Sequence, residues 1–239
     1  MIRPPTSIII QAVATPFVIA GVVIAMLTMD GQSEAAQYWT VMPLVYLLGS
    51  ISWGYMLLRW KMGVDVRDYG SGRTGMSNVL RTGGGKAAVV VLTLDIAKGV
   101  IAVVMARIVI DTTTAEVVAA LIALAGHNWP VFLQFKGGRG ILTALGCLVI
   151  MTPLTAVVAI VTFLTVTGSS RYISLGSVIG VTVAAFVIMA LALADQLPNI
   201  YMLYGFAAAP MIIWQHRDNI QRIRQGSERK LGHPAAKVE

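Results

Sequence analysis

Long apolar segments separated by short charged loops constrain this chain more than any other feature. Hydrophobic residues make up 56% of its 239 residues and charged residues only 12%, about half of the ~25% that is usual in soluble domains. A helix needs ~20 mainly apolar residues to cross a bilayer, and somewhat fewer when it packs within a bundle. Eight segments qualify in full or in part: Ile8–Met29, Val41–Trp60, Ala87–Ile110, Val117–Ala125 continuing into His127–Phe135, Ile141–Met151, Leu154–Thr167, Ile173–Leu193 and Ile200–Trp214. The sequence therefore predicts an all-α integral membrane protein with eight membrane helices, some of them short or broken.

The charges between these segments predict an orientation. With Arg3 in the cytoplasm and one crossing per segment, the basic loop 61–86, the segment 136–139, Arg171 and the C-terminal tail all lie inside. Acidic residues collect on the opposite side: Asp30, Glu34, Asp111, Glu116 and Asp195. Because short basic loops remain in the cytoplasm, both termini are predicted to be cytoplasmic.

The charge distribution, the single cysteine and the spacing of the polar residues argue against several classes of protein. The net charge is +7, but it is divided among short loops rather than gathered in one patch, which argues against nucleic-acid binding. The single cysteine, Cys147, lies in an apolar run and excludes an intrachain disulfide. No set of acidic or histidine residues has the spacing of metal ligands, and no apolar segment carries the cleavage pattern of a removable signal peptide. We expect neither a metal nor a cofactor.

The glycine-rich stretch Gly70–Arg81 is the first candidate binding element. Glycines allow backbone N–H groups to converge on one point, and such concavities bind anions. Ser71, Thr74, Ser77 and Asn78 add hydroxyl and amide groups, and Arg81 can hold a phosphate through two parallel hydrogen bonds. Taken alone, the stretch is more typical of a flexible linker between two spans, so an assignment to a binding site depends on what lies beside it.

Three further polar segments are predicted to lie on the same side of the membrane. In the first, Gly126–Gly140, a glycine cluster with two cations precedes a helix starting near Ile141, and helix N-termini attract anions. The second holds Ser174 and Ser177, which share one helical face. We expect these hydroxyls either to donate hydrogen bonds to a phosphate or only to cap the helix.

The third segment, after the last span, places His216 and Asn219 three residues apart on one face. They belong to a site or are solvated residues at the membrane surface. Within a span, Asp95 and Lys98 are also three apart, where unpaired charge costs at least ~3 kcal/mol. We expect a mutual ion pair facing the bundle interior, acting either as a structural clamp or in direct contact with substrate. His127, at a helix break, is a base, a donor or an interfacial residue.

Together these motifs resemble the bacterial acyl-phosphate:glycerol-3-phosphate acyltransferases, the PlsY family. The resemblance runs in order from about residue 44 to 231 and rests on these motifs: Tyr46-Leu47-Leu48-Gly49-Ser50, Gly70-Ser71-Gly72 with Asn78 and Arg81, Asp95-x-x-Lys98-Gly99, Gly126-His127-x-x-Pro130-Val131-Phe132, Phe135-Lys136-Gly137-Gly138-Arg139-Gly140 and His216-x-x-Asn219-Ile220-x-Arg222. It implies an acyltransferase core over 41–231 with seven helices, an accessory N-terminal helix and outer loop over 1–40, and a polar tail over 232–239.

The resemblance also implies an activity and its location. The expected enzyme of a bacterial cytoplasmic membrane moves a fatty acyl group from acyl phosphate to the 1-hydroxyl of glycerol 3-phosphate, giving lysophosphatidic acid and phosphate. Its active site faces the cytoplasm, its partners are the two substrates and membrane lipids, and no protein partner is implied. The acyl phosphate itself accepts the proton, so no protein nucleophile is needed. The implied catalytic residues are Ser71, Arg81, Arg139, His216 and Asn219. The implied substrate-binding residues are Gly70, Gly72, Asn78, Lys136, Gly137, Gly138, Thr143, Ser174, Ser177 and His127.

Three departures from the family pattern bear on specificity. The family usually has Asn where this chain has Arg73 and Lys where it has Arg139, and Ala-Thr where it has Met76-Ser77. Arginine keeps the charge of lysine but changes its geometry, so a paralogue with a shifted acceptor is one alternative. A protein that binds or transports a phosphorylated metabolite without chemistry is another, and a non-catalytic scaffold is a third.

Overall fold

The computed structural model describes residues 5–233, and every regular element within them is helical. Arg3, on which the predicted orientation rests, and most of the predicted tail 232–239 lie outside the described residues. The elements are α1 (Thr6–Thr28), α2 (Glu34–Ser50), α3 (Trp53–Met62), a 3-10 turn η1 (Val66–Asp68), α4 (Met76–Val109), α5 (Thr113–Asn128), a 3-10 turn η2 (Val131–Leu133), α6 (Ile141–Met151), α7 (Pro153–Ser170), α8 (Ile173–Leu193), α9 (Tyr201–Gln215) and α10 (Arg217–Arg224).

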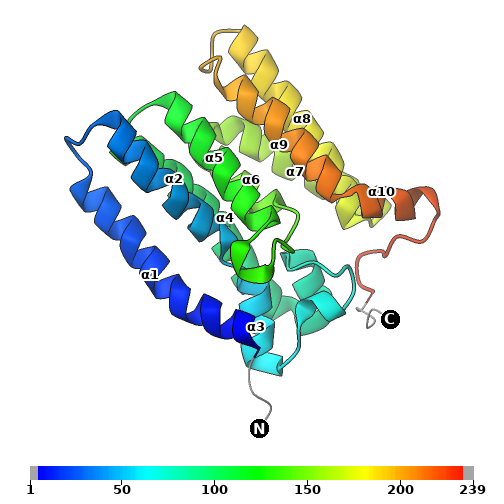
Figure 1. The fold of residues 1–239 in the computed structure, drawn as a ribbon. Helices are drawn as coiled ribbons and strands as arrows, with labels where there is room; N and C mark the ends of the chain where they lie inside the picture. The colour runs from blue at the N-terminus through cyan, green and yellow to red at the C-terminus, as the bar shows by residue number, and fades with distance from the viewer. Residues whose placement is uncertain (1–4, 234–239) are drawn as a thin grey trace.

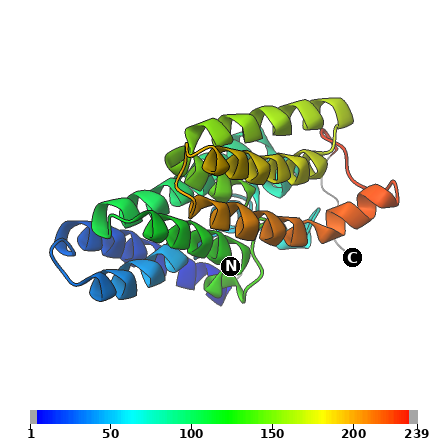
Figure 2. The same cartoon turned by 90° about the horizontal axis from the view of Figure 1, so that it is seen from above.

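The helices form one bundle around α4 (Figures 1 and 2). The long helix α4 packs against α2, α3, α5 and α6, while α7 pairs with α8 and α8 with α9. Glycines bring several of these backbones into direct contact. A Cβ atom on Gly49 of α2 would overlap the carbonyl of Ala123 in α5, and one on Gly146 of α6 would overlap that of Ile96 in α4. Such small-residue contacts are how helices associate where no hydrophobic effect drives them together.

Five described helices are long and apolar enough to cross a membrane: α1, α4, α5 extended through η2, α7 and α8. The bent pair α2 and α3 makes a sixth. The predicted all-α membrane architecture is therefore confirmed, but length and composition support five or six spans rather than eight. The 11-residue α6 and 15-residue α9 fall short of the ~20 residues that a free-standing span needs.

Three predicted segments differ from the structure. The segment Val41–Trp60 is not one helix, because the chain becomes extended at Ile51 and turns by 40° between α2 and α3. Helix α4 begins at Met76 rather than Ala87 and is kinked at Gly84. The φ of Gly84 is 81°, a backbone conformation that glycine adopts readily and other residues rarely do. Helix α5 runs without a break through Gly126 and ends at Asn128, so of the interruptions predicted at Gly126 and Pro130 only the one at Pro130 agrees with the structure.

The loops carrying the four polar motifs gather at one end of the bundle (Figure 1). This end holds the loop between α3 and α4, the turn between α5 and α6, the α7–α8 turn and α10. The acidic loops after α1, α4 and α8 lie at the opposite end. The fold thus brings together segments that are as much as 159 residues apart, as the hydrogen bond from Arg229 to the carbonyl of Gly70 illustrates.

Candidate active site

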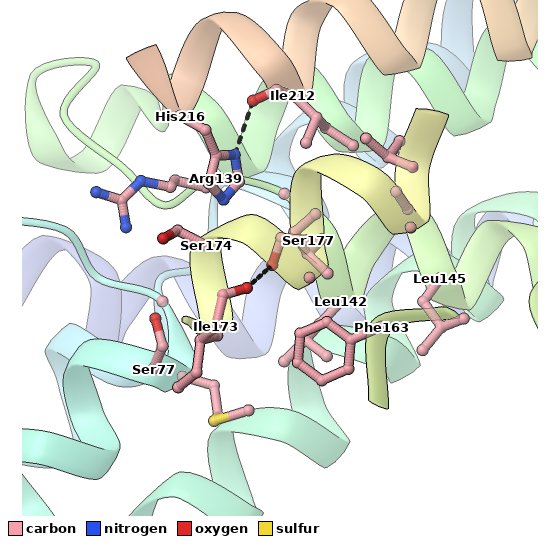
Figure 3. A pocket seen from close by; sticks show the side chains of 18 of the residues that line it. Ser77, Arg139, Leu142, Leu145, Phe163, Ile173, Ser174, Ser177, Ile212 and His216 are labelled. Atoms are coloured by element: carbon pink, nitrogen blue, oxygen red, sulfur yellow. Dashed lines mark hydrogen bonds between the residues drawn. The ribbon is translucent and has the colours of Figure 1, made fainter. Parts of the chain in front are cut away.

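A cavity of about 390 Å³ opens among these loops and extends into the bundle between α4, α6, α7 and α8. Figure 3 shows part of its lining, with His216, Arg139 and Ser174 grouped on one side and Leu142, Leu145 and Phe163 on another. One end of the cavity is therefore polar and cationic, and the other is apolar. Such a cavity fits a molecule with a charged head and a hydrocarbon tail.

The loop after η1 is shaped by a single buried side chain, Asn78. Its amide nitrogen donates to the carbonyls of Val66, Tyr69 and Arg73, each at 2.9 Å, and its oxygen accepts the backbone N–H of Ser71 at 3.1 Å. These contacts engage both ends of the amide. Asn78 lines the cavity, but its amide hydrogen bonds go to the backbone of the loop and stabilise the conformation of that loop.

Three arginines line the polar end. Arg73 approaches Asp218 at 3.7 Å, whereas neither Arg81 nor Arg139 forms an ion pair within residues 5–233. Each is held instead by a backbone carbonyl: Arg81 Nη2 donates to Arg229 and Arg139 Nε to Gln215, both at 3.2 Å. A half-buried guanidinium without a carboxylate is costly unless an anion binds to it.

Several donors at this end remain available. Ser71 Oγ, Arg81 Nε and Arg139 Nη2 are buried, and in the described part of the chain none of them has a hydrogen-bond partner. Burial, followed by the charges of Arg73 and Arg222, lowers the pKa of Arg139 to about 9, which leaves the guanidinium charged at neutral pH. A fixed cation with free donors is what a phosphate group requires.

His216 lies at the junction of α9 and α10, against Arg139 (Figure 3). Its Nδ1 lies 2.8 Å from the carbonyl oxygen of Ile212. Burial and the nearby charge of Arg139 lower the pKa of His216 to about 4, so the ring is neutral at physiological pH. A neutral ring that donates from Nδ1 leaves Nε2 as a hydrogen-bond acceptor.

Glu228 belongs to this site, and the sequence reasoning missed it. Its carboxylate accepts hydrogen bonds from Ser174 Oγ at 2.7 Å, Asn219 Nδ2 at 2.6 Å and Arg222 Nε at 2.7 Å. Burial alone would raise the pKa of Glu228, but these three donors lower it below its usual value. Ser174 and Asn219 are thus joined to the C-terminal segment. Nothing local in Gly226-Ser227-Glu228 indicates this, because the partners lie 9 and 54 residues away.

The predicted ion pair within the membrane is confirmed, since Lys98 Nζ lies 3.0 Å from Asp95 Oδ1. Lys98 also donates to the carbonyls of Gly49 and Ile51, each at 3.1 Å. These carbonyls flank the break between α2 and α3, so Lys98 acts as the clamp that was one of its two predicted roles. Asp95 lines the cavity, and His127 Nδ1 lies 3.7 Å from its carboxylate.

The predicted site residues fall into two groups, those that line the cavity and those that do not. Nine line the cavity: Ser71, Asn78, Arg81, His127, Arg139, Ser174, Ser177, His216 and Asn219. Six lie outside its lining: Gly70, Gly72, Lys136, Gly137, Gly138 and Thr143. Gly137 and Gly138 instead allow their turn to pack against the backbone and ring of His127, and Lys136 is exposed. Ser177 donates to the carbonyl of Ile173 at 2.9 Å (Figure 3).

The apolar end of the cavity reaches the outer surface of the bundle. Ile160 and Leu164 of α7 line it and are also 38% and 60% exposed. Leu148, Val181 and Ala184 lie at its inner end and also line a much smaller void of about 20 Å³ beyond it. The cavity thus has a side opening at the level of the membrane and an inner wall with space behind it.

Comparisons with known proteins point to one family. The glycerol-3-phosphate acyltransferase family matches residues 39–226. Glycerol-3-phosphate acyltransferase 3 of Dehalococcoides mccartyi strain CBDB1 is 42% identical over 80% of this chain and 94% of its own length. The glycerol-3-phosphate acyltransferase of Thermoanaerobacter pseudethanolicus is 40% identical over 79% and 93%.

Two crystal structures of PlsY, an integral membrane glycerol 3-phosphate acyltransferase, share the fold. The glycerol 3-phosphate form superimposes with a TM-score of 0.73 at 34% identity, and the lysophosphatidic acid form with 0.71 at 32%. Each alignment covers 80% of this chain and 94% of PlsY. The expected resemblance is therefore confirmed by sequence and by structure.

Proposed function

This chain belongs to the glycerol-3-phosphate acyltransferase family of PlsY-type integral membrane enzymes, and from that membership we propose how its own residues carry out the reaction. The product is lysophosphatidic acid, the first acylated intermediate of phospholipid synthesis. One observation supports this proposal above the others: the cavity joins arginine donors that have no hydrogen-bond partner within residues 5–233 at one end to an apolar channel at the other. Both a phosphorylated substrate and an acyl chain have a place in it.

We propose acyl phosphate as the donor. Arg81, Arg139 and Ser71 hold the phosphate groups of the two substrates, and the acyl chain lies between α6, α7 and α8. The 1-hydroxyl of glycerol 3-phosphate attacks the acyl carbonyl carbon. The new ester bond forms, the bond between that carbon and the phosphate oxygen breaks, and the hydroxyl proton passes to the departing phosphate. His216 Nε2 accepts a hydrogen bond from the neighbouring 2-hydroxyl of glycerol 3-phosphate and so orients the acceptor, while the proton of the 1-hydroxyl stays free to pass to the phosphate. The enzyme thus contributes proximity and fixed positive charge.

We also propose eight crossings, with both termini and the cavity on the cytoplasmic side. The ends of the short helix α6 lie level with those of α5: Gly140 contacts Asn128 near the end of α5, and the carbonyl of Ile150 accepts from Arg107 at 3.2 Å. Arg107 in turn pairs at 2.7 Å with Glu116, in the first turn of α5. Helix α6 therefore traverses nearly the same depth. The basic loops at one end of the bundle and acidic loops at the other support the orientation.

Acyl transfer by the purified protein tests the proposal. Incubation with palmitoyl phosphate and labelled glycerol 3-phosphate is expected to give lysophosphatidate, and Arg81→Ala and His216→Ala are expected to abolish it while the protein remains folded in membranes. Bound glycerol 3-phosphate without product would favour a binding or transport protein. Unchanged turnover in both variants would refute the assignment of these residues. Palmitoyl coenzyme A in a parallel reaction decides between the two kinds of donor.

A further inference from the structure

Helix α1 precedes the region that matches the family, which begins at residue 39. Its outer face is apolar and exposed, with Phe17 at 73% and Leu27 at 76%, as expected of a lipid-facing helix. Its inner face carries a polar side chain that such a helix does not need. Gln11 is fully buried, and an uncharged but polar residue within a span usually has a partner that gives it a function.

The partner of Gln11 is the break between α2 and α3. Its Oε1 accepts the backbone N–H of Ser52 at 3.0 Å, at the residue where α2 has ended and α3 has not begun. From the other side, Lys98 of α4 takes the carbonyls of Gly49 and Ile51. Free backbone groups at this depth have no water to bind, so α1 and α4 together stabilise the break.

A second polar contact joins α1 to α3. Ser7 Oγ lies 2.6 Å from the hydroxyl of Tyr55, whose side chain is fully buried. The guanidinium of Arg67, which precedes the glycine-rich loop, lies 5.1 Å from the centre of the Tyr55 ring. Arg67 is itself paired with Asp65 at 2.8 Å. The contact therefore continues from α1 through α3 to the start of the loop.

The first turn of α3 also touches the loop directly. Gly54 lies two residues after Ser52, and a Cβ atom there would overlap the carbonyl oxygen of Thr74. Thr74 lies between Arg73, which lines the cavity, and α4, which carries Arg81. Because Gly54 and Thr74 are in such close contact, a displacement of the α3 start displaces the loop.

We propose that α1 positions the phosphate-binding loop, and that Gln11 is the positioning residue through which it does so. By holding Ser52, Gln11 fixes the start of α3, and α3 fixes the loop that presents Ser71 and Arg73 to the cavity. This inference rests on the proposed function, since that function assigns phosphate binding to the loop. It extends the machinery of the reaction to a helix outside the family match.

The test is Gln11→Met in the full-length protein, because methionine has a similar size and offers only a weakly accepting thioether sulfur in place of the amide oxygen. We expect KM for glycerol 3-phosphate to rise about tenfold, the change that corresponds to the ~1.4 kcal/mol of one hydrogen bond, while kcat stays within about twofold. The dissociation constant of glycerol 3-phosphate, measured by calorimetry without donor, is expected to rise equally. Phe17→Met, on the lipid-facing side of the same helix, is the matched control and is expected to change neither value.

Ser7→Ala and Tyr55→Phe test the second contact without disturbing packing. Each is expected to raise KM about fivefold, and the double variant no more than either alone. If Gln11→Met does not fold, the effects of Ser7→Ala and Tyr55→Phe on KM decide whether α1 positions the loop. Unchanged KM and dissociation constant in Gln11→Met, or in both of the other variants, would overturn the proposal. If the wild-type protein binds glycerol 3-phosphate but makes no lysophosphatidate, the proposed function fails, and the dissociation constants still decide the role of α1.

Discussion

Replacing Arg139 by alanine tests the cationic end of the cavity most directly. The Nη2 atom of Arg139 is buried without a partner in residues 5–233, while Nε is fixed by the carbonyl of Gln215 at 3.2 Å. The guanidinium is thus already oriented, and a phosphate oxygen gains a hydrogen bond to a charged donor, which contributes about 1.5–3 kcal/mol. Loss of that bond corresponds to a fall of about 10- to 150-fold in kcat/KM.

The assay is the initial rate of labelled lysophosphatidate formation from palmitoyl phosphate in mixed micelles at pH 7.5. Arg139→Lys keeps the charge but loses the planar fork, so we expect a smaller loss of about fivefold, as for a contact worth ~1 kcal/mol. Lys61→Ala removes an exposed cation in the last turn of α3, at the same end of the bundle as Arg139, and serves as the control. A value of kcat/KM for Arg139→Ala within threefold of wild type would show that this guanidinium does not hold phosphate.

Three further outcomes are expected. Lys98→Met leaves Asp95 buried without its cation and two carbonyls without donors, so the free energy of unfolding should fall by about 3–5 kcal/mol; the double variant with Asp95→Asn should lose less, and equal losses would argue against the pair. The pKa of His216, about 4 in the folded protein because of burial and Arg139, lies below its ordinary 6.5, so the unfolded chain alone takes up a proton between these values. Stability should therefore be unaffected by this group above pH 6.5 and decline by about 3 kcal/mol as the pH falls from 6.5 to 4, and thermal midpoints in detergent for His216→Gln should lack that part of the decline. Leu148→Ala should join the cavity to the void behind it and shift the preference toward longer acyl phosphates, by about fourfold for each additional methylene at ~0.8 kcal/mol, and an unchanged chain-length profile would place the acyl chain elsewhere.

The sequence is sufficient where a segment's own pattern decides its structure. The bounds of α6 and α8 agree with the predicted segments to the residue. Polar residues precede the start of each helix and follow the end of α8, and Pro153 disfavours continuation of α6 beyond Met151. The Asp95–Lys98 pair is equally predictable, since two charges one turn apart within a span have few other partners.

Long-range contacts decide what the sequence does not disclose. The segment Val41–Trp60 is apolar enough on average to be predicted as one span despite Ser50 and Ser52. Its break at Ile51 is stabilised by Gln11 and Lys98, which bind the backbone groups there from two other helices. Helix α4 extends across three glycines of low helix propensity, where Gly83 packs against Leu58. Glu228 reads as part of a solvated tail until its three donors are seen in place.

The side opening at Ile160 and Leu164 has a consequence for how the enzyme meets its lipid partners. An acyl donor that enters there diffuses within the plane of the membrane, so its encounter rate follows its mole fraction in the bilayer rather than its concentration in the aqueous phase. The product leaves with its tail already among the surrounding lipids. Dilution of micelles with additional detergent should slow the reaction at constant total donor, which is the behaviour of surface-dilution kinetics.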